Sequence, residues 1–455
     1  MTDDSTLSRR GLLRLTAGAA GVAALPNLLT PTPASASGPA YVDDLAAPAI
    51  APNILADDVY PIGLFWPPPR KQTTEFRYEQ IANCGINVVS GGNDMVNMPA
   101  NTKMLQMAAH AGLRALPIDN RITHATPCPG WENAVRQTVA EYQAYPAFAG
   151  FLVHDEPNPI HYPRLRMITD LLAATAPDKL GFINLVPFYT TPQDGAYQEF
   201  LRRYVEQIDP SVVSYDHYPL LTDNTIRPTF FVNHRRIREA GLRSGRPTWV
   251  YVNTVQHGVM KQPTQAELGW QVNVALAYGC KGIQYFTYWT PENRPDHFFH
   301  EALIRKSGCP SAVYGWAWEL NRCHLQPVGR ELKHLVSHAA VHANEATLPF
   351  GTERFTAAGS DVLSATSGSA VVLGEFRSEP VNNTRWLFVA NRSYTAAANA
   401  RLTIKPEVDS VGTFVATSAT YQPTLLIGTP AGQAFDVTIP PGGGKLFRLA
   451  LTPPA

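Results

Sequence analysis

Short apolar runs alternate with longer stretches of helical periodicity from about residue 60 to residue 342. The apolar runs, which indicate buried strands, are 60–66, 85–89, 113–118, 148–153, 180–186, 212–216, 248–255 and 282–289. The stretches that indicate helices are 73–83, 101–111, 131–145, 162–176, 197–208, 229–240, 265–278 and 311–342. Repeated strand–helix units predict parallel strands, and eight of them over roughly 285 residues favour a closed (β/α)8 TIM barrel. An open doubly wound sheet would have a glycine-rich turn after its first strand, which residues 63–67 do not supply.

The pattern changes from about Ala346. Helical periodicity stops, and short β-branched runs separated by Gly, Pro, Asn and Ser follow at 370–376, 385–390, 400–404, 435–439 and 445–451. Runs of this kind predict a small antiparallel β-sandwich. We therefore expect a barrel over 59–344 and a C-terminal β-sandwich over 345–455.

The chain begins with a predicted targeting segment. Residues 8–11 (SRRG) form a twin-arginine pattern, a mildly apolar run covers 12–29, and residues 34–36 (ASA) fit a small-residue cleavage site. We expect residues 1–37 to be a twin-arginine signal peptide, 38–58 to be a linker, and the mature chain to be secreted. A transmembrane anchor is the alternative, but the run is short, rich in Gly and broken by a proline.

Charge and cysteine content narrow the possible functions. The 455 residues include 37 Lys and Arg against 37 Asp and Glu, so no basic surface for nucleic acid is expected. Beyond the targeting segment, no apolar run is long enough to span a membrane. Cys309 and Cys323 are close enough in sequence to pair in an oxidising compartment, or they remain free thiols. The five cysteines show no zinc-ligand spacing, so we expect neither a metal nor a cofactor.

Polar and aromatic side chains stand where the predicted strands end. In a parallel barrel the C-terminal ends of the strands share one rim, which is where such barrels carry their chemistry. This rim would hold Trp66, Asp119, Asp155, Glu156, Asn184, Asp216, Tyr218, Gln256, His257, Trp289 and Glu292. Carboxylates, amides and aromatic rings at one mouth suit a polyhydroxylated ligand, such as an oligo- or polysaccharide.

Cleavage of a glycosidic bond needs two carboxyl groups. One donates a proton to the leaving oxygen, and the other attacks the anomeric carbon or activates water. Glu156 is the first candidate for the acid, because it directly follows a buried strand and burial beside Asp155 favours the protonated form. Helix capping or pairing with an arginine is the structural alternative for these two residues. Asp216 or Glu292 could supply the second carboxylate.

The remaining rim residues are expected to contact the substrate, with Asp119 binding a hydroxyl group. His154 and His217 flank acidic residues, which makes a metal site conceivable. Neither histidine belongs to an HxH or HxxxH pattern, however.

Three segments together resemble bacterial barrel glycoside hydrolases. They are DEP at 155–157, YDHYP at 215–219 and GCKGIQYFTYW at 279–289. The nearest group is the superfamily around glycoside hydrolase family 42 and its relatives. The resemblance covers the chain from about Tyr60 and implies a glycosidase whose barrel is followed by a small β domain, to which 386–392 (WLFVANR) would contribute a strand. It also implies a glutamate acid after the fourth strand, a position that Glu156 matches.

One departure from that superfamily affects the mechanism. There an Asn usually precedes the acid, and the nucleophile is a glutamate that ends the seventh strand. Here Asp155 precedes the acid, and 252–256 (VNTVQ) contains no carboxylate, so the usual retaining mechanism is not carried over. Asp216 or Glu292 would then replace the missing group, for example as the base of an inverting enzyme.

Three alternatives remain open from the sequence. Asp155 and Glu156 resemble the Asp–Glu pair of N-acetylhexosaminidases, in which the acetamido group of the substrate attacks, and Tyr218 could help to hold that group. A non-catalytic carbohydrate-binding protein on a decayed barrel is the second. A metal-dependent barrel hydrolase is the third.

Overall fold

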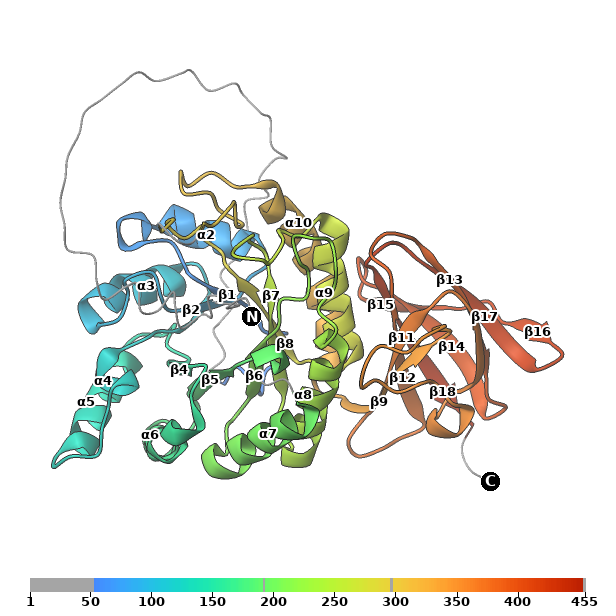
Figure 1. The fold of residues 1–455 in the computed structure, drawn as a ribbon, viewed down its shortest axis with the longest axis horizontal. Helices are drawn as coiled ribbons and strands as arrows, with labels where there is room; N and C mark the ends of the chain where they lie inside the picture. Colours follow the sequence, from blue (N-terminus) through green and yellow to red (C-terminus); the bar gives the residue numbers. More distant parts are fainter. Residues whose placement is uncertain (1–52, 191–192, 295–297, 453–455) are drawn as a thin grey trace, which may run out of the picture.

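The fold comes from a computed structural model, which describes residues 53–190, 193–294 and 298–452. A barrel of strands and helices lies beside an all-β domain, and the long axis of the molecule runs through both (Figure 1). The predicted signal peptide and most of the predicted linker lie outside the described residues.

Eight parallel strands form the barrel, in the order β3-β2-β1-β8-β7-β6-β5-β4. They are β1 (Ile62–Phe65), β2 (Val88–Ser90), β3 (Arg114–Leu116), β4 (Gly150–Asp155), β5 (Leu180–Leu185), β6 (Val213–Asp216), β7 (Thr248–Asn253) and β8 (Gly282–Phe286). A parallel bridge between Ala115 and Phe148 joins β3 to β4. The Ala115 N–H donates to the Ala147 carbonyl over 2.7 Å, and the Ala149 N–H donates to the Ala115 carbonyl over 3.0 Å. These bonds close the sheet, which confirms the predicted TIM barrel.

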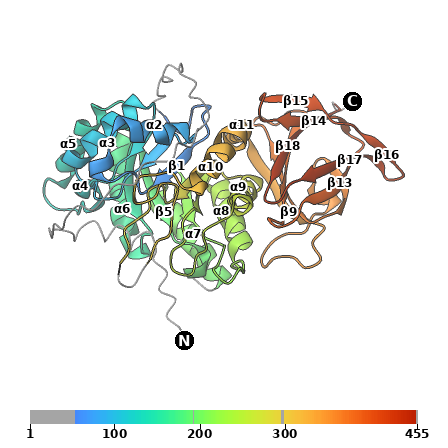
Figure 2. The same cartoon turned by 90° about the horizontal axis from the view of Figure 1, so that it is seen from above.

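The helices surround this barrel (Figure 2). They are α2 (Glu75–Asn83), α3 (Met98–His110), α4 (Asn120–Thr123), α5 (Trp131–Gln143), α6 (Tyr162–Thr175), α7 (Asp194–Ile208), α8 (Phe230–Ser244), α9 (Gln265–Ala277), α10 (Ala312–Leu320) and α11 (Gln326–Lys333). Their ends follow from local sequence. The Asn97 side chain caps α3, a Thr264–Glu267 capping box begins α9, and Gly245, with φ 65°, ends α8 in the left-handed conformation.

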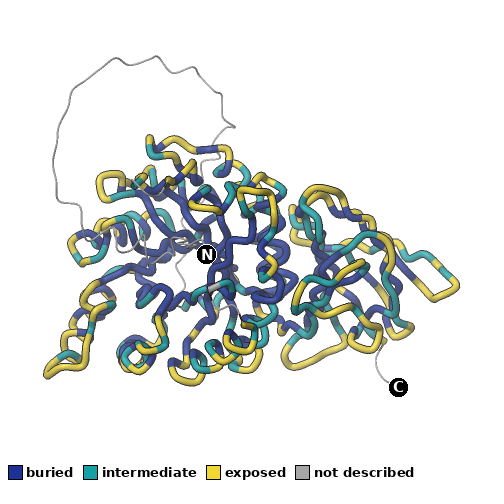
Figure 3. The backbone as a smooth tube through the Cα atoms, viewed as in Figure 1, coloured by how far each residue is buried: buried dark blue, intermediate teal, exposed yellow. Residues whose placement is uncertain are grey.

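The C-terminal domain consists of two antiparallel sheets, as predicted. One has the order β10-β13-β17-β16 and the other β15-β14-β18-β12-β11-β9. The strands are β9 (Val336–Ala343), β10 (Leu363–Gly368), β11 (Val371–Arg377), β12 (Thr384–Asn391), β13 (Ala398–Ile404), β14 (Val408–Val415), β15 (Thr420–Pro423), β16 (Ile427–Thr429), β17 (Gly432–Ile439) and β18 (Gly444–Leu451). Buried segments run through the interior of each domain (Figure 3), and the sandwich has an apolar core of its own.

The helix predicted over 311–342 is wrong in its second half. A π-helical turn at Asn321–Leu325 separates α10 from α11, which ends at Lys333, and Val336–Ala343 form β9. The C-terminal sheets therefore begin at Val336 rather than at 345. Alanines and histidines give β9 no clear alternation, and its antiparallel pairing with β11 decides its conformation.

Helix α9 lies between the two domains. Almost all of its side chains are buried, including Trp270, Gln271 and Asn273. The barrel covers one side of the helix, and β11 and β12 cover the other. This double coverage explains why α9 is apolar around its circumference.

Residues 53–58, the described end of the predicted linker, are held with Val59 at the N-terminal ends of the barrel strands. The Lys333 Nζ donates to the carbonyl of Val59 over 2.9 Å and to Asp57 Oδ1 over 2.8 Å. Asp57 also pairs with Arg114 on β3. Within the described ranges, none of the helices is both long and apolar enough to cross a bilayer.

Candidate active site

The C-terminal end of β4 carries the two adjacent carboxylates. The rings of His154 and of His161, in the turn that follows, have centroids 5.9 Å apart. Asp155 is in register with Asn184 on β5, which is in register with Ser214 on β6. Residues in register on neighbouring strands share one face of the sheet, so Asp155 points into the barrel as Ser214 does. Asp155 is 3% exposed and Glu156 is 4% exposed. Both predicted residues therefore lie buried at the rim.

Two predicted rim residues have a backbone conformation that is unusual for their type. Glu156 has φ 50° and Trp66 has φ 64°, although neither is a glycine. Left-handed φ values are costly for such residues and concentrate at functional sites. Glu156 directly follows β4 and Trp66 directly follows β1. At each of them the left-handed backbone ends the strand and changes the direction in which the side chain points.

Asn184, at the end of β5, connects its two neighbouring strands. Its carbonyl accepts a hydrogen bond of 2.8 Å from the Glu156 N–H. Its side-chain Nδ2 donates to Asp216 Oδ1 over 2.8 Å, and its Oδ1 accepts from the Ser214 hydroxyl over 2.9 Å. The amide is therefore fixed in one orientation, and it joins the ends of β4 and β6.

The C-terminal end of β6 places the third carboxylate. The Tyr215 hydroxyl contacts His234 Nδ1 on α8 at 2.5 Å, so Tyr215 points outward. Ser214 and Asp216, on either side of it, consequently point into the barrel. Asp216 is 2% exposed. Burial, with smaller contributions from His234 and Arg227, holds the pKa of His217 well below its usual range, so this ring is neutral beside Asp216.

Aromatic rings pack together in the segments that follow β6, β7 and β8. Tyr218 stacks on Phe286 at the end of β8, with ring centroids 5.1 Å apart, and lies edge-on to His257 at 5.5 Å. His257 stacks in turn on Phe299 at 5.9 Å. Trp289 is buried, with the Arg77 guanidinium 5.4 Å from its ring centroid. Tyr218, His257 and Trp289 thus lie at the strand ends where the sequence placed them.

Asp119 is occupied by protein contacts. It caps α4 by accepting from the Arg121 N–H over 2.9 Å, and the Arg121 guanidinium binds both of its carboxylate oxygens, over 3.1 and 2.9 Å. The Tyr142 hydroxyl donates to Asp119 Oδ2 over 2.8 Å. Capping and arginine pairing, which the sequence offered for the β4 carboxylates, are therefore seen at Asp119.

The rim residues after β7 and β8 differ in accessibility. The side chain of Glu292 is 87% exposed and lies 3.8 Å from Lys306 Nζ. Gln256 is half-buried, and its carbonyl accepts from the His300 N–H over 3.1 Å. At the end of β7, the Asn253 amide donates to the Lys261 carbonyl over 2.9 Å, and the Thr254 hydroxyl donates to the Thr287 carbonyl over 2.9 Å.

Sequence reasoning missed three contributors to this site. Ser214 stands two positions before Asp216 on a predicted strand, so strand alternation alone could have placed both on one face. Phe299 and Arg227 lie in irregular segments without periodicity, and the sequence carries no signal for them. Arg227 stacks on Tyr189, with its guanidinium carbon 4.1 Å from the ring centroid.

The cysteines and potential metal ligands are dispersed. Cys309 and Cys323 are exposed free thiols, and Cys84 and Cys280 are buried. Among the residues that the structure describes, no three His, Cys, Asp or Glu side chains are grouped to hold a metal ion.

Solved structures with this architecture were found by comparing folds. The β-galactosidase of Bacillus circulans sp. alkalophilus matches 88% of this chain and 100% of its own, with 12% identity and a TM-score of 0.57. The chain shares its fold with this glycosidase. At that identity the likeness concerns the architecture of barrel and β domain, and the chemistry has to be argued from the residues.

Two further matches are more distant. The β-galactosidase of the psychrophilic Marinomonas ef1 has 12% identity and a TM-score of 0.46, over 60% of this chain and 62% of that one. A family 30 subfamily 8 xylanase of Clostridium acetobutylicum has 10% identity and a TM-score of 0.41, over 83% and 92%. A scan of the sequence against family models gives no match, and neither does a search of curated sequences.

Proposed function

We propose that this protein is an exported glycoside hydrolase that cleaves an O-glycosidic bond of an oligo- or polysaccharide. The observation that carries the proposal is the connection from Glu156 through Asn184 to Asp216 at the C-terminal rim of the barrel. Asn184 binds the backbone N–H of Glu156 and the carboxylate of Asp216, and both residues are buried. Two carboxyl groups are what glycosidic cleavage requires.

Glu156 is the general acid in this proposal. It ends β4, it is shielded from water, and its strained backbone fixes the direction of the side chain. Its proton goes to the glycosidic oxygen as the bond to the anomeric carbon breaks. The leaving sugar then departs as a neutral alcohol, which lowers the barrier more for a poor leaving group than for a good one.

Asp216 is the second carboxylate and acts as a base. Neighbouring strands lie about 4.8 Å apart, so the ends of β4 and β6, separated by β5, are about 10 Å apart at the backbone. An inverting enzyme needs its two carboxyl groups roughly 6.5–9.5 Å apart, which leaves room for the attacking water, and the proposal requires this separation of Glu156 and Asp216. Asp216 removes a proton from a water molecule that attacks the anomeric carbon opposite to the leaving group.

A substrate screen tests this function. The purified mature protein is assayed on a panel of aryl glycosides and cell-wall polysaccharides beside Glu156→Gln, Asp216→Asn and Glu292→Gln. The first two variants should lose about a thousandfold or more in kcat/KM, whereas Glu292→Gln, at an exposed site, should stay near wild type. Loss in Glu292→Gln together with full activity in Asp216→Asn would reverse the assignment of the base.

The same screen separates the alternatives. NMR of the first product formed should show an inverted anomeric configuration. A substrate-assisted hexosaminidase would cleave only glycosides that carry an acetamido group, and would retain the configuration. Sugar binding without turnover on any glycan would identify a binding protein, and activity removed by a chelator would identify a metal-dependent hydrolase.

A further inference from the structure

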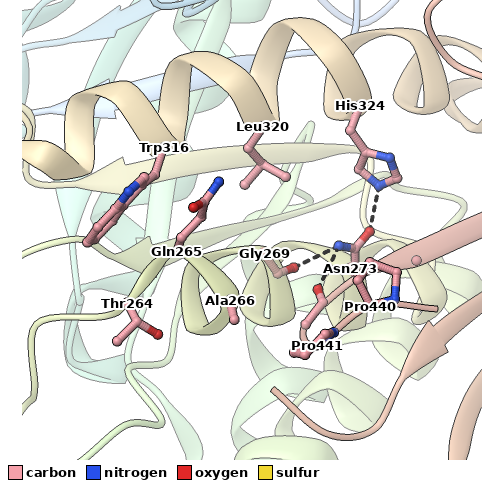
Figure 4. Close-up of a pocket in the computed structure, with 13 residues that line it drawn as sticks. Thr264, Gln265, Ala266, Gly269, Asn273, Trp316, Leu320, His324, Pro440 and Pro441 are labelled. Carbon is pink, nitrogen blue, oxygen red and sulfur yellow. Dashed lines mark hydrogen bonds between the residues drawn. The ribbon is translucent and has the colours of Figure 1, made fainter. Parts of the chain in front are cut away.

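A second concave site lies outside the barrel mouth, where the outer wall of the barrel meets the C-terminal domain (Figure 4). A cavity of about 720 Å³ opens between α9, α10 and the turn that joins β17 to β18. Trp316 and Leu320 extend from α10 toward it, and Gln265 extends from the start of α9 on the opposite side. The residues of the turn, 440–444, form the third side.

The floor of this cavity is built from both domains and held rigidly. The Asn273 Nδ2 on α9 donates to the Gly442 carbonyl over 3.0 Å, and its Oδ1 contacts His324 Nε2 at 2.7 Å. Gly442 sits so close to α9 that a Cβ at this position would lie 1.9 Å from the Ala266 carbonyl oxygen. Pro440 and Pro441 add fixed backbone angles beside it. The shape is therefore present before any ligand arrives.

The chemistry of the lining selects a neutral ligand. Every lining residue is uncharged at neutral pH: there is no Lys, Arg, Asp or Glu among them, and burial lowers the pKa of His324 to about 4. An ionic ligand would lose its hydration without gaining an opposite charge. The Asn273 amide is engaged by Gly269, Gly442 and His324. The polar side chains that remain for a ligand are the Gln265 amide and the Thr264 hydroxyl, which pair with hydroxyl groups.

The aromatic surface points to the same ligand class. Trp316 is only partly buried and presents an indole ring at the edge of the cavity. The Gln265 Nε2 donates to Glu319 Oε2 over 2.8 Å, which orients its carbonyl oxygen as an acceptor. Thr264 adds a hydroxyl at the same end. A flat apolar face beside hydroxyl-binding groups suits a pyranose ring, which has apolar C–H faces and a polar rim.

We propose that this cavity, defined by Trp316, Gln265, Asn273 and the 440–444 turn, binds a neutral segment of a polysaccharide chain apart from the barrel mouth. The site requires no catalysis at the mouth, so it goes beyond the proposed hydrolase function. In a glycoside hydrolase, a second binding site of this kind raises the local concentration of polymer near the active site. It would therefore favour the turnover of long substrates and leave the turnover of small ones unchanged.

Native gel electrophoresis in the presence of soluble xylan, mixed-linkage β-glucan or galactan tests the site. Wild type should be retarded by at least one of the three polymers. Trp316→Ala should weaken that retardation about fivefold or more, and Gln265→Ala should weaken it in the same direction. Trp318→Ala is the matched control, because Trp318 is an exposed tryptophan of the same helix that does not line the cavity, and it should bind as wild type does.

Thermal unfolding of each variant checks that the fold is kept. If Trp316→Ala unfolds, Gln265→Ala, at an exposed position, decides alone. Absence of retardation by all three polymers, or retardation that neither substitution alters, would overturn the proposal.

Turnover of aryl glycosides by the same variants separates this proposal from the previous one. Binding that depends on Trp316 without any turnover supports the second site and counts against the hydrolase. Turnover without such binding supports the hydrolase and rejects the second site.

Discussion

The side chain of Asn184 donates a 2.8 Å hydrogen bond to Asp216, and this bond sets the direction of the carboxylate that we assign as the base. The Ser214 hydroxyl donates a hydrogen bond to the oxygen of the same amide. Asn184 was expected to touch the substrate directly. Because both polar atoms of its side chain are engaged within the protein, we now assign it a positioning role toward Asp216.

Replacing Asn184 should therefore reduce turnover more than substrate binding. Asn184→Ala removes the donor and should lower kcat about 10- to 100-fold with little change in KM, since small misplacements of a reacting group carry costs of this size. Ser214→Ala, which leaves the donor in place, should lose less. Steady-state kinetics on the best aryl glycoside measure both values.

The pH profile distinguishes positioning from a general structural defect. Asn184→Asp places a second carboxylate beside Asp216, which disfavours ionisation of the base. The acidic limb of the kcat/KM profile should therefore move to higher pH. An unshifted limb with an equally low rate would mean that Asn184 supports only the fold.

Acid should weaken the C-terminal domain through Asp361. This carboxylate accepts hydrogen bonds from Arg377 and from Arg385, the latter over 2.6 Å, with His338 nearby. Burial alone would raise the pKa of Asp361, but the two arginines outweigh it and hold the pKa at about 2. The unfolded chain takes up the proton near pH 4. The stabilisation is therefore complete above about pH 4 and is lost as the pH falls through 2.

Urea unfolding at two pH values measures this contribution. Asp361→Asn should be less stable than wild type at pH 5, and the difference between the two proteins should shrink at pH 2. A difference of the same size at both pH values would show that the charge of Asp361 is not its cause.

The β17–β18 turn packs closely on α9, so replacing one glycine of this turn should lower the stability of the protein. Gly442→Ala combines a positive φ of 68° with the collision against Ala266, so it should lower the free energy of unfolding by about 1–3 kcal/mol. Gly428→Ala is the control, because nothing lies within 4 Å of the added Cβ there. Equal stability of the two variants, measured by denaturant unfolding, would contradict the packing argument.

The predicted export is tested by changing the two arginines of the twin-arginine pattern. Replacing Arg9 and Arg10 together by lysine should leave the protein inside the cell, whereas Arg14→Lys, outside the pair, should be exported as wild type is. Cell fractionation and immunoblotting measure the outcome. Export of the double variant would remove the twin-arginine assignment.

The barrel was predictable because its signals are local. Buried strands appear in the sequence as apolar runs. Capping residues, such as Thr264 and Glu267 at the start of α9, indicate where helices begin. Strand β9 was missed because its alanines and histidines carry no period, and only pairing with β11 shows that it is a strand. Tertiary contacts of this kind cannot be read from one segment.

The positions of the candidate site residues were predictable in part. Asp155, Glu156 and Asp216 were expected where strands end, and the structure has all three there and buried; their catalytic roles stay predictions. The ion pair of Asp119 with Arg121 and the engagement of Asn184 depend on which atoms face each other, so spacing along the chain could not separate them from substrate contacts.

The central claim, that Glu156 delivers a proton to the leaving oxygen, is tested most directly by varying the leaving group. Wild type and Glu156→Gln are compared on a pair of aryl glycosides of the same sugar, one with an acidic nitrated phenol and one with a simple phenol. We predict that Glu156→Gln loses about a thousandfold in kcat/KM on the simple phenyl glycoside and far less on the nitrated one, which departs without a proton. Equal losses on both substrates, or no loss on either, would contradict the assignment of Glu156 as the acid.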